Sequence, residues 1–145
     1  MRLIIDGDAC PDKDSISRIA LKYDIDMYVF IDYAHVLEDN YYKIITCEVG
    51  HDSVDMAIVN FVSQGDLVIT QDYGLAGLLL TKGVQVLHTS GKVINEDNIN
   101  ILLSTRYLHA QLRKSGQRIK GPAKRTKEDT QYLLNQLENI LKQQS

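Results

Sequence analysis

Residues 65–72 read Gly-Asp-Leu-Val-Ile-Thr-Gln-Asp. They consist of a glycine typical of a turn, a short apolar run and an acid at the end. The run at 67–70 is continuous rather than alternating, which is typical of a strand covered on both faces of a sheet. Residues 2–6 form a similar run, which also ends in an acid, Asp6. We therefore expect buried parallel strands whose carboxyl ends carry acidic side chains.

Segments with helical spacing alternate with such runs along the chain, and this alternation predicts βαβ units. Strands are expected at 2–6, 27–31, 42–47, 66–70 and 84–87. Helices are expected at 12–23, 53–63, 75–81, 95–113 and 128–142. The predicted fold belongs to the α/β class. It is a three-layer α/β/α sandwich with a five-stranded, mainly parallel sheet. Residues 32–41 are few for a parallel crossover, so they hold a compact helical turn or the two flanking strands are not parallel.

Composition and length limit the classes of protein that the chain can belong to. With 145 residues, 44% hydrophobic and 24% charged, it is typical of one globular domain with a real core. No apolar run approaches the length of a membrane span. Two cysteines provide neither a disulfide framework nor a paired zinc motif. We interpret the chain as a single domain over 1–145 of a cytoplasmic protein without membrane contact.

The charges are divided unevenly along the chain. Residues 1–105 carry 7 Lys and Arg against 16 Asp and Glu, whereas residues 106–127 carry 8 Lys and Arg and no acid. A final helix at 128–143 follows this basic segment. An acidic body with one basic segment suggests an anionic partner that also meets a cation. The alternative is a solvated charge run without a partner.

Acidic side chains close or open several of the predicted elements. Asp6 and Asp8 follow the first strand, Asp52 and Asp55 begin a helix, and Asp72 follows the fourth strand. Strand ends and helix starts share one edge of an open parallel sheet, where ligands bind. Converging carboxylates repel each other unless a cation lies among them, and oxygen ligands suit Mg²⁺ or Mn²⁺. The predicted catalytic and metal-binding residues are Asp6, Asp55 and Asp72.

Asp8, Asp52, Thr70 and Gln71 are predicted to support this site. Thr70 and Gln71 either hydrogen-bond metal-bound water or a substrate phosphate, or they cap the next helix. Helix capping is also an alternative for the acids, because Asp is a preferred N-cap residue. Taken alone, Asp52 and Asp55 are better explained as residues that stabilise a helix start.

The basic segment is predicted to contact the phosphate backbone of a nucleic acid. Arg106 and Arg113 are seven residues apart, so they share one face of a predicted helix. The predicted nucleic-acid contacts are Arg106, Arg113, Lys120, Lys124 and Arg125. RNA is the expected partner, although the residues themselves do not distinguish RNA from DNA.

Four stretches resemble the YaiI/YqxD family of bacterial proteins of unknown function. They are residues 6–11 (Asp-Gly-Asp-Ala-Cys-Pro), 50–55 (Gly-His-Asp-Ser-Val-Asp), 65–72, and 120–125 (Lys-Gly-Pro-Ala-Lys-Arg). Gly7 stands where members of the family commonly have Ala. The family resembles PIN-like nucleases, which implies a sheet of order 3-2-1-4-5 with Mg²⁺ or Mn²⁺ held by Asp6, Asp55 and Asp72.

Three functional hypotheses follow. The first is a metal-dependent nuclease that acts on RNA. The second is a phosphatase similar to the haloacid-dehalogenase-like group, with Asp6 as nucleophile and Asp8 as acid and base, and with Thr70 and Lys82 as further residues of the site. The third is an RNA-binding protein without catalysis, which uses the basic segment alone.

Overall fold

The structure, a computed structural model, describes residues 1–7, 10, 12–32, 42–47, 53–116 and 124–144. Six strands form one sheet of order β3-β2-β1-β4-β5-β6. The strands are β1 (Leu3–Asp6), β2 (Met27–Asp32), β3 (Lys43–Cys47), β4 (Leu67–Thr70), β5 (Gln85–His88) and β6 (Val93–Ile94). All neighbouring pairs are parallel except β5 with β6. The expected order 3-2-1-4-5 is confirmed, with β6 added at its edge.

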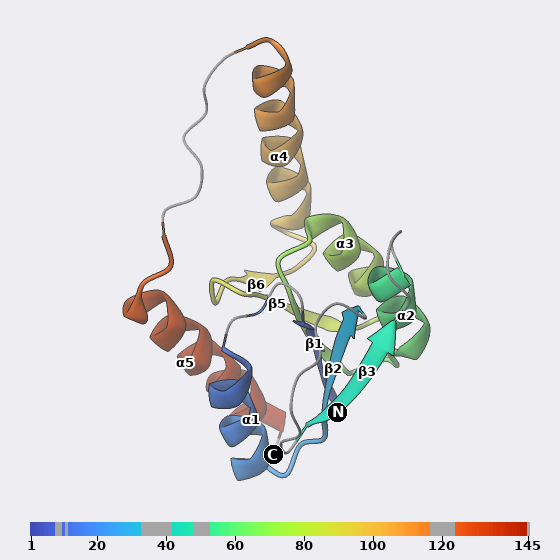
Figure 1. Cartoon of the computed structure of the whole chain (residues 1–145), viewed down its shortest axis with the longest axis vertical. Coiled ribbons are helices and arrows are strands. Elements are labelled where there is room, and N and C mark those ends of the chain that lie inside the picture. The colour runs from blue at the N-terminus through green and yellow to red at the C-terminus, as the bar shows by residue number, and fades with distance from the viewer. Residues whose placement is uncertain (8–9, 11, 33–41, 48–52, 117–123, 145) are drawn as a thin grey trace.

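Helices cover both faces of this sheet, which makes the expected three-layer sandwich (Figure 1). The helices α1 (Lys13–Lys22) and α5 (Lys127–Gln144) pack on one face. On the other face lie α2 (Ser53–Phe61), α3 (Tyr73–Thr81) and the first turn of α4 (Ile99–Lys114). None of the helices that the structure describes combines the length and the apolar character that crossing a membrane requires.

Alternate residues of each strand serve the two faces, as the pleat of a strand dictates. Leu3 and Ile5 of β1 pack with Leu137 of α5, whereas Ile4 packs with Leu79 of α3. All of these side chains are fully buried. Each such burial contributes about 1.5–3 kcal/mol, and this two-sided burial explains why the strands are continuously apolar in sequence.

Two parts of the prediction differ from the structure. The strand β6 has only two residues, too few to give a recognisable pattern. The helix α4 begins at Ile99 rather than at residue 95, because the Asn95 side chain makes a competing turn. Its Oδ1 accepts hydrogen bonds from the backbone N–H groups of Asp97 (2.9 Å) and Asn98 (3.1 Å).

The strands β2 and β3 are parallel, so the nonparallel alternative for these two strands is excluded. The connection between them, residues 33–41, lies outside the described residues.

The second half of α4 projects away from the rest of the molecule (Figure 1). Ile99 is buried and Leu102 and Leu103 are half-buried, but every residue from 104 to 111 is exposed. The projecting part therefore receives little of the tertiary packing that normally stabilises a helix.

An ion pair joins the start of β1 to the start of β4. Asp66 accepts hydrogen bonds from the Arg2 backbone N–H (3.0 Å) and from Arg2 Nε (3.2 Å) and Nη2 (2.8 Å). The Ser63 backbone N–H donates a fourth, at 2.8 Å. Burial by itself raises the pKa of the Asp66 carboxyl, but the hydrogen bonds from Arg2 and Ser63 and the charge of Arg2 outweigh it, and the pKa lies below its ordinary value.

The first prediction is that Asp66→Asn lowers the free energy of unfolding by about 2–4 kcal/mol at pH 7, because buried donors lose a charged acceptor. A depressed pKa stabilises the fold above the ordinary Asp pKa, and this contribution is lost as the pH falls through the folded-state pKa. The difference between wild type and variant should therefore be constant from pH 8 to 5 and shrink below about pH 4, measured by urea denaturation.

Glu138→Gln, which breaks the exposed Lys22–Glu138 pair, is the matched control and should lose much less stability. Equal losses in both variants would contradict this account of the Arg2–Asp66 pair.

The turn between β5 and β6 generates a second prediction. Gly91 has a φ of +96°, and a Cβ there would stand 2.5 Å from Tyr132 Cδ2 on α5. Gly91→Ala should lower the free energy of unfolding by about 2–5 kcal/mol, through backbone strain and overpacking. Gly116 has a φ of +85° with no described atom within 4 Å of such a Cβ, so Gly116→Ala should lose about 1–2 kcal/mol. Thermal unfolding of both variants measures the difference, and equal losses would show that the contact with α5 is unimportant.

Candidate functional site

Asp6 and Thr70 lie side by side at the carboxyl edge of the sheet. Asp6 is the last residue of β1 and Thr70 is the last residue of β4, and the preceding residues Ile5 and Ile69 are paired. Asp6 is 8% exposed and Thr70 is fully buried. The sequence expectation that acidic and polar strand ends meet at one edge is confirmed for this pair.

A short chain of hydrogen bonds links Asp6 to Asp72. The Thr70 hydroxyl donates to Asp6 Oδ2 at 2.9 Å, and the backbone N–H of Asp72 donates to Thr70 Oγ1 at 3.1 Å. An amide N–H can only donate, and a hydroxyl has one proton. The Thr70 proton is therefore directed to Asp6, and Thr70 holds one oxygen of that carboxylate in place.

Asp72 is the N-cap residue of α3, and its carboxylate contacts the described part of the chain through one oxygen. Oδ1 accepts hydrogen bonds from the backbone N–H groups of Gly74 (2.8 Å) and Leu75 (3.2 Å), and it lies 3.6 Å from Arg106 Nη1. Oδ2 forms no hydrogen bond within the described part of the chain, and the side chain is 34% exposed. The capping role is thus present, and it leaves Oδ2 accessible to a ligand.

Asp55 belongs to another element, the helix α2. It lies half-buried in the first turn of α2, a helix that packs against β1 and β2. Asp8 and Asp52 lie outside the described residues, and Gln71 is exposed next to Thr70. No three His, Cys, Asp or Glu side chains among the described residues cluster closely enough to hold a metal ion. That Asp6, Asp55 and Asp72 share one ion therefore stays a prediction.

The donor chemistry of the edge nevertheless fits Mg²⁺ or Mn²⁺. Mg²⁺ is commonly held by one or two carboxylates, with water and substrate phosphates completing its octahedron. Asp6 presents a buried carboxylate that Thr70 positions, and Asp72 presents an oxygen that the helix cap does not use. These two acids offer hard oxygen ligands from neighbouring strand ends.

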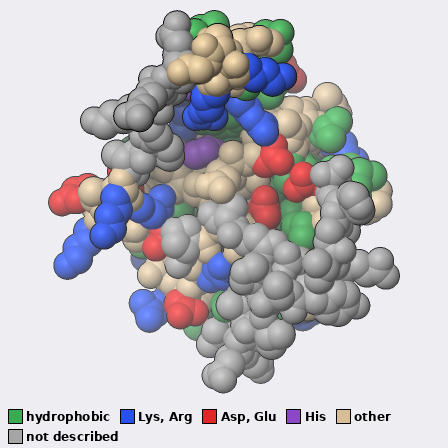
Figure 2. Space-filling view, turned by 45° about the horizontal axis from the view of Figure 1, so that its top comes forward, with side chains coloured by type: hydrophobic (Ala, Val, Ile, Leu, Met, Phe, Trp, Pro, Cys, Tyr) green, Lys and Arg blue, Asp and Glu red, His purple; other side chains and the backbone are tan. Residues whose placement is uncertain are grey.

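Two of the predicted basic residues line a hollow, and one of them, Arg106, lies near Asp72. Arg106 and Arg113 of α4 line a hollow of about 310 Å³ together with Tyr73, Leu102, Thr105 and His109. Figure 2 shows Lys and Arg side chains around a hollow that contains a His side chain, with acidic side chains beside it. A cationic wall therefore stands next to the acidic strand ends.

The remaining basic residues of the prediction are placed differently. Arg125 donates from Nη2 (2.8 Å) and Nε (3.2 Å) to Asp12 Oδ2, which ties the chain before α5 to the start of α1. Lys124 is exposed, and Lys120 lies outside the described residues. The guanidinium of Arg125 is thus already occupied within the fold.

His88 lies at the same edge, which the sequence prediction missed. It ends β5 in register with Thr70, and its ring stacks on Tyr73 with the ring centroids 5.2 Å apart. The backbone N–H of Ser90 donates to Nδ1 at 3.0 Å, so the proton of the neutral ring is on Nε2. Burial first, and then the charges of Lys92 and Arg125, lower the pKa of His88 below its ordinary value. The missed signal is a polar residue directly after the apolar run at 84–87.

Comparison with known proteins places the chain among uncharacterised bacterial proteins. Residues 4–143 match the family model described as "Uncharacterized BCR, YaiI/YqxD family". A "UPF0178 protein" of Clostridium kluyveri is 42% identical over 141 residues, covering 97% of this chain and 93% of the relative. Another from Natranaerobius thermophilus is 42% identical over 144 residues, covering 99% and 95%.

A third "UPF0178 protein", from Staphylococcus saprophyticus, is 43% identical over 143 residues, covering 97% of this chain and 93% of its own. No solved structure matches the chain. Because the family model and these relatives all span nearly the whole sequence, the protein belongs to the YaiI/YqxD family.

Proposed function

We propose that this protein is a nuclease that hydrolyses phosphodiester bonds in RNA with Mg²⁺ or Mn²⁺ bound by Asp6, Asp72 and Asp55. The observation that carries the proposal is the link from Asp6 through Thr70 to Asp72, whose carboxylate stands 3.6 Å from Arg106. Acidic side chains that can hold a cation, next to arginines that can hold a polyanion, suit a polyanionic substrate that reacts at a metal ion. The resemblance to PIN-like nucleases supports the same reading.

Each residue of the edge would have a separate role in this reaction. A divalent ion, when bound, activates water and neutralises charge on the scissile phosphate. Thr70 holds the Asp6 carboxylate in one orientation, so little reorganisation is needed when a ligand arrives. Asp72 keeps its helix cap through Oδ1 and offers Oδ2.

Arg106 would orient the phosphate. Its pairing with Asp72 is long and its side chain is mostly exposed, and such pairs contribute little stability. A phosphate group can therefore replace Asp72 as its partner with little loss.

The phosphatase hypothesis is not supported by the position of Lys82. Lys82 is the C-cap residue of α3, and its Nζ donates to the backbone oxygen of Val59. Asp72 caps the opposite end of the same helix. Ten residues of helix separate the two by about 15 Å. Lys82 is therefore remote from the edge that carries Asp6, and the nuclease hypothesis is the one that the geometry favours.

The central prediction concerns the two acids. Asp6→Asn and Asp72→Asn should each lower RNA cleavage with Mn²⁺ by at least about 100-fold, on the order of the loss when one group that stabilises a transition state electrostatically is removed. RNA affinity measured in EDTA should change little, because Arg106 and Arg113 are unchanged. The Asp6→Asn/Asp72→Asn double variant should also lose Mn²⁺ binding in calorimetry. Asn is as good an N-cap as Asp, so Asp72→Asn keeps the cap of α3.

Asp97→Asn, at an exposed acid before α4, is the matched control and should retain both cleavage and Mn²⁺ binding. Loss of RNA affinity together with cleavage in Asp72→Asn would contradict the assignment. RNA binding that is indifferent to chelator and to both changes, without any cleavage, would instead support a non-catalytic RNA-binding protein.

Thr70 generates a separate prediction, as a positioning residue. Thr70→Val keeps the shape but removes the hydroxyl, so Asp6 loses its fixed orientation and Mn²⁺ affinity should fall by about 10–100-fold. Thr70→Ser restores the hydroxyl and should recover most of that affinity. Calorimetry with Mn²⁺ measures both variants. Equal affinities for Val and Ser would show that the hydrogen bond to Asp6 does not matter for the metal.

A further inference from the structure

The hollow beside the acidic edge has walls of two chemical kinds. Its cationic wall is the face of α4 that carries Arg106, His109 and Arg113. Tyr73 of α3 also lines the hollow. The stack of His88 on one side of the Tyr73 ring fixes the plane of that ring. A ligand that fits both walls carries a negative charge and a flat ring.

The size of the hollow limits what can enter it. Its volume of about 310 Å³ lies at the lower end of the range for small-molecule pockets, about 300–1,000 Å³. A single nucleotide suits such a volume. A base within a duplex enters only after it is unpaired and unstacked, which costs about a few kcal/mol, whereas a base of a single strand does not have to break a base pair. Sequence-tolerant binding of single strands commonly combines a basic groove with an aromatic side chain on which a base stacks.

The projecting part of α4 also points to an anionic partner. Helices of fewer than about 12–15 residues are marginal in water without tertiary packing, yet residues 104–111 are all exposed. Arg106, Arg113 and Lys114 are its charged residues, and it has no acid over 99–114. Because the charges of this part of α4 are all positive, it attracts an anion.

We propose that this hollow holds one unstacked nucleotide of single-stranded RNA, with its base against Tyr73 and its phosphate between Arg106 and Arg113. The inference rests on the proposed function and specifies its substrate class. Because Arg106 Nη1 lies 3.6 Å from Asp72 Oδ1, a phosphate held by Arg106 lies beside the acidic edge. The hollow thus selects unpaired strands and positions the phosphodiester bond at that edge for cleavage.

Fluorescence anisotropy tests the strand preference without catalysis. The probes are a fluorescein-labelled ten-nucleotide oligouridine and a labelled ten-base-pair RNA duplex, both in EDTA. The single strand should bind at least tenfold more tightly than the duplex. Single-stranded DNA of the same length is a third probe, whose affinity reports whether the 2′-hydroxyl contributes. Equal or tighter binding of the duplex would overturn the proposal.

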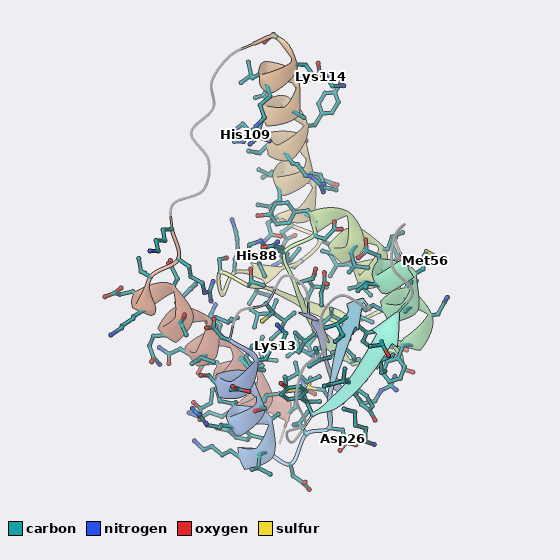
Figure 3. All side chains as sticks on the ribbon, in the orientation of Figure 1. Lys13, Asp26, Met56, His88, His109 and Lys114 are labelled. Carbon is teal, nitrogen blue, oxygen red and sulfur yellow. The ribbon has the colours of Figure 1, made fainter. Side chains whose placement is uncertain are left out.

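Two pairs of variants test the two walls. Arg113→Gln and Lys114→Gln remove the same charge from adjacent residues, and Figure 3 shows His109, which lines the hollow, and Lys114 on different sides of α4. Arg113→Gln should weaken single-strand binding at least fivefold, and Lys114→Gln less than twofold. Tyr73→Leu removes the ring and should weaken binding about 5–100-fold, whereas Tyr73→Phe should bind as wild type. Circular dichroism confirms that each variant is folded.

The outcomes separate this inference from the proposed function. Equal effects of Arg113→Gln and Lys114→Gln, or a Tyr73→Leu variant that binds as wild type, would overturn the nucleotide site while leaving cleavage by the acidic edge untouched. Strong, ring-dependent binding of single strands without any cleavage would refute the nuclease and keep the nucleotide site.

Discussion

The direction of one hydroxyl proton organises the candidate site. The backbone N–H of Asp72 takes up a lone pair of Thr70 Oγ1, so the Thr70 proton has to go to Asp6. Two acids that are 66 residues apart in the chain are thereby connected by two hydrogen bonds. This connection requires β1 and β4 to be adjacent, parallel and in register up to Ile5 and Ile69. The packing that requires these strands to be apolar therefore also determines where their polar ends lie.

The fold brings acidic and basic residues together that are far apart in the sequence. Asp6 and Asp72 lie at the carboxyl edge, and Arg106 of α4 lies within 3.6 Å of Asp72. An exposed ion pair at this separation contributes little stability. It therefore holds Arg106 near Asp72 without blocking the site to a ligand. The same guanidinium can serve Asp72 in the free protein and a phosphate in a complex.

Much of this fold follows from the sequence because the strong signals are local. Continuous apolar runs such as 67–70 and helical spacing in 128–142 depend on burial alone, and both are confirmed with small shifts of their ends. The edge position of Asp6, Thr70 and Asp72 followed from those runs. The two-residue strand β6, the competing Asn95 turn and the stack of His88 on Tyr73 depend on contacts between segments, so local patterns could not reveal them.

The basic segment shows where counting charges misleads. Its eight cations over 106–127 suggest one uniform binding surface, but the structure divides the described members by role. Arg125 is held by Asp12 and fastens the chain before α5 to α1, so it supports the core of the sandwich. Arg106 and Arg113 face the hollow beside Asp72. Arg125, which donates two hydrogen bonds to Asp12, is less available to an anion than Arg106, which lies 3.6 Å from Asp72. Among the described residues of the segment, Arg106 and Arg113 are therefore the two guanidinium groups that we propose for contact with a polyanion.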